Sequence, residues 1–334
     1  MLKYIIKRLL MLIPVLLGVS IMVFAIMHLF TADPTASILG DYATKDQIDN
    51  LRQQLGLNQP LYVQYWDFLK ALSHGDLGTS IITQTPIAKD IAVKFPATIE
   101  LAFTAIIIAS VVGITLGILS AINQNKLWDH ISMVISLIGI SMPTFWLGLL
   151  LIIFFAVQLH VLPVSGRIQI GMEPQNITGF YLLDSLITGN MNSFVDALKH
   201  IILPGLALSA YSTSVISRMT RSAMIEVLNK EYIRTAKAKG ILDKSIIIKH
   251  AFRNALIPVV TVIGLQLGGL LGGAVLTETI FAWPGIGSYT IDAILKSDYP
   301  VVQSTVILLA STFVIVNLIV DLLYAYLDPR IKYM

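Results

Sequence analysis

Six long apolar segments dominate the pattern of this chain, and most charged residues lie between them. The segments cover about residues 9–30, 97–122, 131–158, 201–217, 255–277 and 301–320. A helix of about 20 apolar residues, rising about 1.5 Å per residue, matches the ~30 Å hydrocarbon layer of a bilayer. The pattern therefore predicts an all-α integral membrane protein with about six transmembrane helices.

The first and third segments carry further signals. Three basic residues precede the first one: Lys3, Lys7 and Arg8. This start resembles a signal peptide, but the apolar run is too long and no small-x-small cleavage site follows, so we expect an uncleaved membrane helix. The third segment contains Pro143, which predicts a kink or a break. A tilted helix that only packs and a bend that lines a pathway explain it equally well; Pro143 and Trp146 are the pathway candidates.

The polar stretch at 31–96 has a helical pattern of its own. Thr44 to Gln47 matches a capping box, and the helix that follows should stop near Gly56. Five apolar residues then share one helical face: Leu61, Tyr65, Phe68, Leu69 and Leu72. We expect a small helical extracytoplasmic subdomain, or an amphipathic helix on the membrane surface, with simple packing as the alternative for any single residue. The chain then divides into 1–96, the first helix plus this subdomain, and 97–334, a five-helix core.

The distribution of basic residues predicts the orientation. With the N-terminus inside, 15 of the 23 Lys and Arg residues are cytoplasmic, including Arg330 and Lys332 near the C-terminus. Positive charge favours the cytoplasmic side, and an even number of spans returns the C-terminus there. We therefore expect both termini in the cytoplasm.

Composition agrees with a membrane protein and excludes several functions. Hydrophobic residues make up 55% of the 334, charged residues 13%, and the mean hydropathy is +0.77. There is no cysteine, so disulfides and thiolate metal sites are excluded. The chain also lacks a phosphate-binding loop, a His-Glu-x-x-His motif and a Gly-x-Ser-x-Gly motif, and its span centres are nearly free of ionisable residues. We predict no catalytic, metal or cofactor site, and these absences disfavour an intramembrane hydrolase and a proton-coupled secondary peptide transporter.

The stretch from Arg218 to Pro258 is the strongest functional candidate. It holds nine basic and three acidic residues between two spans. Its pattern predicts a helix over 222–239 that ends at Gly240, then a second helix over about 243–252. Attraction to lipid headgroups explains the charge, but a helix–glycine–helix shape also suits docking into a partner's groove. We place the coupling loop at about 222–254.

The fifth apolar segment is rich in glycine. Its glycines form two rows spaced by four residues: Gly264, Gly268 and Gly272, and Gly269 and Gly273. Such rows let helix backbones approach closely, and Gln266 between them needs a polar partner. Packing within or between subunits is one interpretation; a thin helix beside the translocation route, with Gln266, Gly268 and Gly272 as candidates, is the other. Glu278 follows at the outer end, where it is solvated unless, as the family resemblance described below implies, it belongs to an outer gate or scaffold element.

The run Glu231-Tyr-Ile-Arg-Thr-Ala-Lys-Ala-Lys-Gly240 resembles the cytoplasmic "EAA" loop of bacterial ABC importer permeases. The resemblance implies a type I ABC importer permease fold. It also implies that this loop contacts the ATPase, through six residues: Glu231, Arg234, Thr235, Ala236, Lys237 and Gly240. Arg234 and Thr235 replace the motif's Glu and first Ala, and the later Leu-Pro is displaced to Ile257-Pro258.

These departures resemble the peptide/nickel branch of that family, and further motifs along the chain fit it. They include Leu55–Pro60, Gly75–Ser80, Thr277–Gly285, Asp298–Gln303 and Asp328–Arg330. Pro163–Arg167 and Thr178–Asp184 are most similar to the B-type subunit of dipeptide permeases.

The resemblance implies a non-catalytic, multi-pass subunit of the bacterial inner membrane. Its partners would be a second homologous permease, two ATP-binding subunits and an extracytoplasmic substrate-binding protein, with no nucleic acid. The implied cargo is dipeptides or short peptides, with nickel chelates, glutathione or haem as the alternatives.

Overall fold

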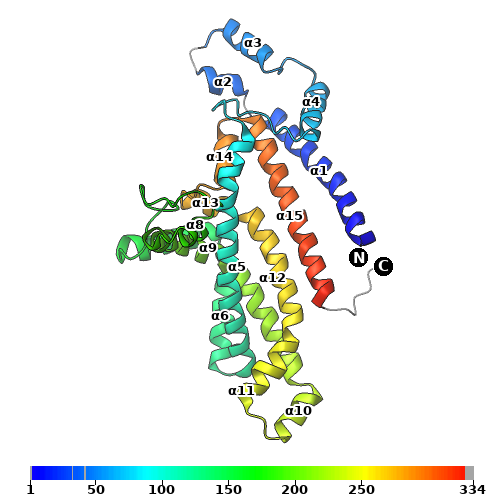
Figure 1. Ribbon diagram of the computed structural model, residues 1–334, viewed down its shortest axis with the longest axis vertical. Coiled ribbons are helices and arrows are strands. Elements are labelled where there is room, and N and C mark those ends of the chain that lie inside the picture. The colour runs from blue at the N-terminus through cyan, green and yellow to red at the C-terminus, as the bar shows by residue number, and fades with distance from the viewer. Residues whose placement is uncertain (1, 32, 41–42, 328–334) are drawn as a thin grey trace. The chain divides into compact units, whose positions relative to one another are not determined.

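The computed structural model describes residues 2–31, 33–40 and 43–327, and helices dominate these ranges. The first part of the chain forms α1 (Leu2–Phe30), α2 (Pro34–Leu39), α3 (Lys45–Gln54), α4 (Leu61–Ser73), α5 (Ile87–Ile122), α6 (Leu127–Ser141), α7 (Thr144–Leu151), the π-helix η1 (Ile152–Gln158) and α8 (Tyr181–Ile187). The rest forms α9 (Met191–Leu228), α10 (Glu231–Ala238), α11 (Asp243–Ser245), the π-helix η2 (Ile246–Phe252), α12 (Arg253–Gly273), α13 (Val275–Ile280), α14 (Ile286–Leu295) and α15 (Tyr299–Leu327). Figure 1 shows their order along the chain. Arg330, Lys332 and the Asp328–Arg330 motif lie outside the described residues.

The prediction of an all-α chain with about six spans is confirmed. Within the described ranges, five helices are long and apolar enough to cross a membrane, and a bent pair makes a sixth if it counts as one span. The bent pair is the third apolar segment: Leu127–Ser141 and Thr144–Gln158 meet at 108°. Met142 between them is extended, with φ −86° and ψ 128°, and Pro143 has no N–H to continue the first helix. The expected single segment is therefore broken at this proline.

The described residues form two compact units. The first combines Met1–Thr98 with Pro284–Thr312, so it contains α14 and the start of α15 as well as the helices of the polar 31–96 stretch. Its core includes Met27, Ile87 and Ile286, all nearly inaccessible to solvent. The predicted capping box at Thr44 is confirmed, with both reciprocal hydrogen bonds to Gln47.

The second unit combines Ile99–Trp283 with Phe313–Met334, and α9 is its central helix. α9 contacts α6, α7, α8 and α12. Glycines on α5 and α6 bring their backbones against α9: a Cβ at Gly117 would lie 2.7 Å from the carbonyl oxygen of Ser217, and one at Gly139 2.8 Å from that of Ala210. Small residues at such crossings permit the close approach that drives helix association in membranes.

Candidate functional site

The basic element of the second unit begins where α9 ends, and here one prediction is wrong. Residues 222–239 do not form one helix, because α9 stops at Leu228 and α10 starts at Glu231. The side-chain amide of Asn229 donates to the carbonyl of Ile225 at 3.0 Å, and Lys230 is extended with φ −74° and ψ 149°. Asparagine side chains compete with the backbone in this way and end helices. The element is therefore helix, turn, short helix, glycine and helix.

The predicted stop at Gly240 is confirmed. Gly240 has φ +74°, and a Cβ there would meet nothing within 4 Å, so glycine is favoured for its backbone conformation rather than for space. Its N–H bonds to the carbonyl of Lys237 at 2.9 Å, and the N–H of Ile241 bonds to that of Ala236 at 3.3 Å. These two bonds are the Schellman arrangement, which turns the chain sharply after a helix.

α10 has one buried edge and one exposed face. Ile233 and Ala236 are buried in a cluster with Met224 of α9 and Ile246 of η2. Arg234 is 71% exposed and pairs with Glu231 at 3.1 Å.

The predicted contact residues of α10 therefore divide into two groups. Thr235 and Lys237 share the exposed face with Arg234 and Glu231, whereas Ala236 packs inward. A polar face held in place by a buried apolar edge is suited to contact with another protein.

The second predicted helix, over about 243–252, exists but is not separate. α11 and η2 run into α12 without a break. The side-chain amide of Asn254 on α12 donates to the hydroxyl of Tyr232 on α10 at 3.1 Å. α10 and α11 lie at the same end of the second unit, where α9 leads in and α12 leads out (Figure 1). α10 is therefore linked to both α9 and α12, through the buried cluster and the hydrogen bond between Asn254 and Tyr232.

An ion pair between the buried Asp129 and the partly buried Arg221 joins the neighbouring helices. Asp129, in the first turn of α6, is 2% exposed and accepts two hydrogen bonds of 2.8 Å from Arg221 of α9. It also accepts from the hydroxyl of Ser120 on α5 and, at 2.9 Å, from the N–H of Asn125. The carboxylate therefore joins α5, α6 and α9. Sequence reasoning missed this pair, although Arg221 lay inside the basic stretch.

The pathway candidates do not form one cluster. Trp146 is 43% exposed on α7, directly after the bend at Pro143. Gln266 on α12 has the partner that we expected, since the hydroxyl of Ser212 on α9 donates to its carbonyl oxygen at 3.0 Å. No described hydrogen bond or ion pair joins these α7 and α12 residues.

The two candidate glycines of α12 lie in different surroundings. A Cβ at Gly268 would lie 3.1 Å from the side-chain oxygen of Asn317 on α15, whereas one at Gly272 would meet nothing within 4 Å. Among the described residues, that Asn317 oxygen is one of three buried side-chain atoms without a hydrogen-bond partner. Gly268 therefore packs within the subunit, whereas Gly272 of the same row faces open space.

Glu278 is not solvated, which corrects one of the two interpretations. Its exposure is 0%, and it lies in the short helix α13. The chain folds back after it, because the N–H of Trp283 bonds to the Glu278 carbonyl at 2.8 Å. The N–H of Gly166 bonds to the carbonyl of Phe281 at 2.8 Å, which connects the loop at 159–180, between η1 and α8, to the same turn.

A buried ion pair joins this loop to α5. Arg167 and Glu100 are 6% and 7% exposed and lie 2.6 Å apart. The guanidinium also donates to the carbonyl of Gly179 at 2.7 Å and lies 3.8 Å above the ring of Tyr181. This pairing could not be predicted from local sequence patterns, because Arg167 and Glu100 are 67 positions apart.

Asp184 orders the loop from within. It accepts hydrogen bonds from the hydroxyl of Thr178 and from the backbone N–H groups of Ile177, Thr178 and Gly179. Burial by itself would raise the pKa of this carboxyl, but these hydrogen bonds outweigh burial and hold its pKa below the ordinary value. The Asp184 carboxylate is therefore ionised and orders residues 177–179 outside the spans.

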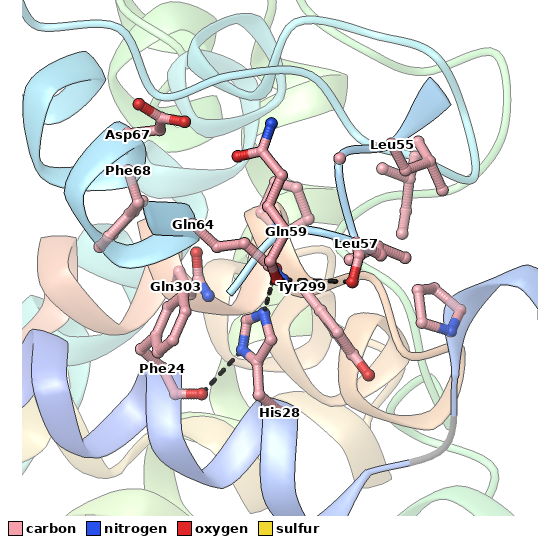
Figure 2. A pocket seen from close by; sticks show the side chains of 14 residues that line it. Phe24, His28, Leu55, Leu57, Gln59, Gln64, Asp67, Phe68, Tyr299 and Gln303 are labelled. Atoms are coloured by element: carbon pink, nitrogen blue, oxygen red, sulfur yellow. Dashed lines mark hydrogen bonds between the residues drawn. The ribbon is translucent and has the colours of Figure 1, made fainter. Parts of the chain in front are cut away.

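The first unit contains a cavity of about 220 Å³ with a mixed lining. Figure 2 shows His28 of α1 beside Gln64 of α4, with Tyr299 and Gln303 from α15. The His28 ring bonds to Gln64 at 3.1 Å. Across the described residues no group of His, Asp and Glu side chains is arranged to hold a metal ion.

These features define a class: a multi-pass membrane protein with a basic helix–glycine–helix element at one end of its spans. Family models identify it further. Residues 113–333 match the model described as "Binding-protein-dependent transport system inner membrane component", and residues 1–102 match the model of that component's N-terminal part. The chain belongs to this family of ABC importer permeases.

Similar proteins agree with this assignment. The chain is 50% identical to a dipeptide transport system permease protein, DppB, of Alkalihalophilus pseudofirmus, with 100% of both chains covered. It is 48% identical to a probable D,D-dipeptide transport system permease protein, DdpB, of Escherichia coli, over 96% of this chain and 94% of the relative. Among solved structures, the MetNI methionine ABC transporter in an inward-facing conformation matches with a TM-score of 0.53 and 17% identity. That match covers 70% of this chain and 93% of the other, and it shows the same fold.

Proposed function

We propose that this chain is one of two homologous permease subunits of an ATP-driven importer, and that its cargo is dipeptides or short peptides. The support is the full-length similarity to permeases named for dipeptides, at 50% and 44% identity. A glutathione transport permease of E. coli is 41% identical over the full chain, so glutathione is the main alternative cargo. Both cargoes are peptides with free carboxylates.

The observation that carries the mechanism is the exposed face of α10 on a buried support. Glu231, Arg234, Thr235 and Lys237 would contact a separate ATP-binding subunit. Because Ile233 packs against Met224 and Ile246, a push on that face moves α9 and η2 with it. ATP binding and hydrolysis in the partner then shift the spans between inward-open and outward-open states, and a two-state change of this kind needs only different affinities of the partners for the two states.

We infer the orientation from the positive-inside rule. Both termini and α10 lie in the cytoplasm of a bacterial inner membrane, and the helices between α1 and α5 lie outside with the loop that Asp184 organises. A substrate-binding protein would deliver cargo on that outer side.

Charge reversal on α10 tests the docking. Arg234→Glu and Lys237→Glu each place a negative charge on the exposed face without touching the buried edge. We expect the double variant to lose co-purified ATP-binding subunits and transport-coupled ATPase while it keeps its sister permease. Lys45→Glu, the same change on the exposed surface of α3, is the matched control and should behave as the parent chain.

The docking proposal fails if the double variant retains the ATP-binding subunits and coupled ATPase at the parent's level. Cargo needs its own experiment: purify the cognate binding protein with its ligand, identify that ligand, and measure its uptake by proteoliposomes that contain the complete complex. Uptake of glutathione in preference to dipeptides would replace the dipeptide assignment and leave the importer assignment intact.

A further inference from the structure

Helix α4 lies against the outer half of the first spanning helix. The hydroxyls of Tyr65 and Ser20 are 2.9 Å apart, and the rings of Tyr65 and Phe24 pack edge to face at 5.2 Å. Gln64, the residue before Tyr65, bonds to His28, which lies one turn beyond Phe24 on α1. The two helices are therefore in contact along several turns.

The order of these contacts shows the direction of α4. Leu61, at its start, lines a shallow hollow with Leu29, at the outer end of the α1 span. Leu72, at its end, lines another hollow with Ile13, far down the same span. α4 thus begins at the outer end of α1 and descends beside it.

The apolar run of α1 sets the depth of this contact. Leu10–Leu29 is long and apolar enough to cross a membrane. Nine residues separate Ser20 from Leu29, or about 14 Å of helix, which is close to half of a ~30 Å hydrocarbon layer. The part of α4 around Tyr65 therefore lies beside α1 at the level of the outer leaflet.

The two sides of α4 have different chemistry. Gln64, Asp67 and Phe68 line the cavity of the first unit (Figure 2). Tyr62 and Trp66, four residues apart and so on one helical face, are 75% and 66% exposed. Aromatic rings with a polar atom are the side chains that concentrate at membrane–water interfaces.

Neighbouring residues extend this exposed face. Ile13, Leu17 and Ile21 of α1 are 54%, 42% and 55% exposed, and they continue the apolar surface of α1 beside α4. Lys70 of α4 is exposed at the edge of this surface, where its aliphatic stem can lie on apolar groups while its amine reaches water.

We propose that Tyr62 and Trp66 form a lipid-contacting face, and that α4 enters the bilayer from its outer side beside α1. The occupant is phospholipid, with Tyr62 nearer the headgroups and Trp66 beside the acyl chains. A solvent-exposed docking face for a binding protein would not need to lie beside the hydrocarbon-spanning run of α1. The helix would then anchor the outer part of the first unit at a fixed height above the membrane.

Cysteine scanning can test this directly, because the parent chain has no cysteine. Trp66→Cys and Tyr62→Cys are each spin-labelled in the complete complex in lipid nanodiscs, and the same complex with the cysteine-free chain supplies the background. Collision with oxygen, which concentrates in lipid, is compared with collision with a water-soluble nickel chelate. Ile21→Cys on α1 is the lipid reference, and Asp49→Cys on α3, where the side chain is 70% exposed, is the aqueous reference.

We expect both α4 labels to lose nickel accessibility and gain oxygen accessibility relative to the Asp49 label, so that they approach the Ile21 label. Two results overturn the proposal. Labels as accessible to nickel as the Asp49 label would place the face in water, and labels accessible to neither reagent would place it under a protein partner. Two independent positions keep the test decisive if one variant fails to assemble.

Discussion

A close crossing of α5 and α9 in the second unit can be tested with a single methyl group. A Cβ built on Gly117 of α5 would lie 2.5 Å from the Cβ of Thr220 and 2.7 Å from the carbonyl oxygen of Ser217, both on α9. Neither atom can rotate away, because one is backbone and the other is fixed to it. Gly117→Ala therefore has to push the two helices apart.

The size of the effect follows from two opposed contributions. Overpacking a well-packed site costs about 1–3 kcal/mol, whereas alanine is favoured over glycine inside a helix by up to about 1 kcal/mol. We expect Gly117→Ala to destabilise by up to about 2 kcal/mol, as the difference of these estimates. Gly18→Ala on α1 is the matched control: nothing lies within 4 Å of its Cβ, so only the favourable contribution remains.

The assay is heat stability of the complete complex in nanodiscs, followed as the fraction that stays monodisperse at each temperature. Gly117→Ala should lower the midpoint, and Gly18→Ala should leave it unchanged or raise it. Equal midpoints for the two variants would refute the close approach of α5 and α9. Gly269→Ala adds information, since its Cβ is also unobstructed here; a lowered midpoint would show that another chain covers that face of α12.

Two further variants test the buried carboxylates. Asp129→Asn leaves Arg221 without its charged partner and should cost about 3–5 kcal/mol, seen as a lower heat-stability midpoint. Asp33→Asn breaks a more exposed pair, in which Asp33 is 32% and Arg52 41% exposed, and should cost at most about 1 kcal/mol. Equal losses in the two variants would contradict the burial of Asp129. Because the pKa of Asp184 is depressed, its contribution is complete above the ordinary carboxyl value of about 3.9 and is lost only as the pH falls through the lower pKa of the folded state. Amide exchange of residues 177–179 should therefore show no loss of protection from Asp184 protonation between pH 8 and pH 5. Asp184→Asn should weaken protection throughout that range by about 2 kcal/mol, as expected for hydrogen bonds to a charged group. A protection loss near pH 6 that the Asp184→Asn variant lacks would refute the depressed pKa of Asp184.

Local patterns predicted local structure well. The capping box at Thr44, the helix stop at Gly240 and the break at Pro143 each depend on one or two residues whose backbone preferences are strong. The spans were equally predictable, because a bilayer requires long apolar helices whose backbone groups are all hydrogen-bonded. The end of α9 at Leu228 was missed because Asn229 is only a weak helix breaker.

Contacts between distant segments could not be predicted in this way. Solvation was one of the two interpretations for Glu278, yet this residue is buried, and Glu100 is buried as well. Only the folded loop between η1 and α8 brings Arg167 to Glu100. The glycine rows of α12 predicted a close helix contact because their glycines recur every four residues. The pair Gly113 and Gly117 has the same spacing and makes the closer backbone contacts, and a sequence does not reveal which of two rows has a helix opposite.

The packing of the second unit suggests which helices move together. α5, α6 and α9 meet at backbone distance through Gly117 and Gly139, and Asp129 joins all three, so separating them would break buried contacts of high cost. α12 is joined to α9 at membrane depth by the hydrogen bond between Ser212 and Gln266, and side-chain amides exchange partners more easily than buried ion pairs. We therefore expect motion of α10 to carry α5, α6 and α9 as one body and to slide α12 along it. Gln266→Leu should then change the balance between inward-open and outward-open states, measured by accessibility of single cysteines on each side, while Asp129→Asn should reduce stability first.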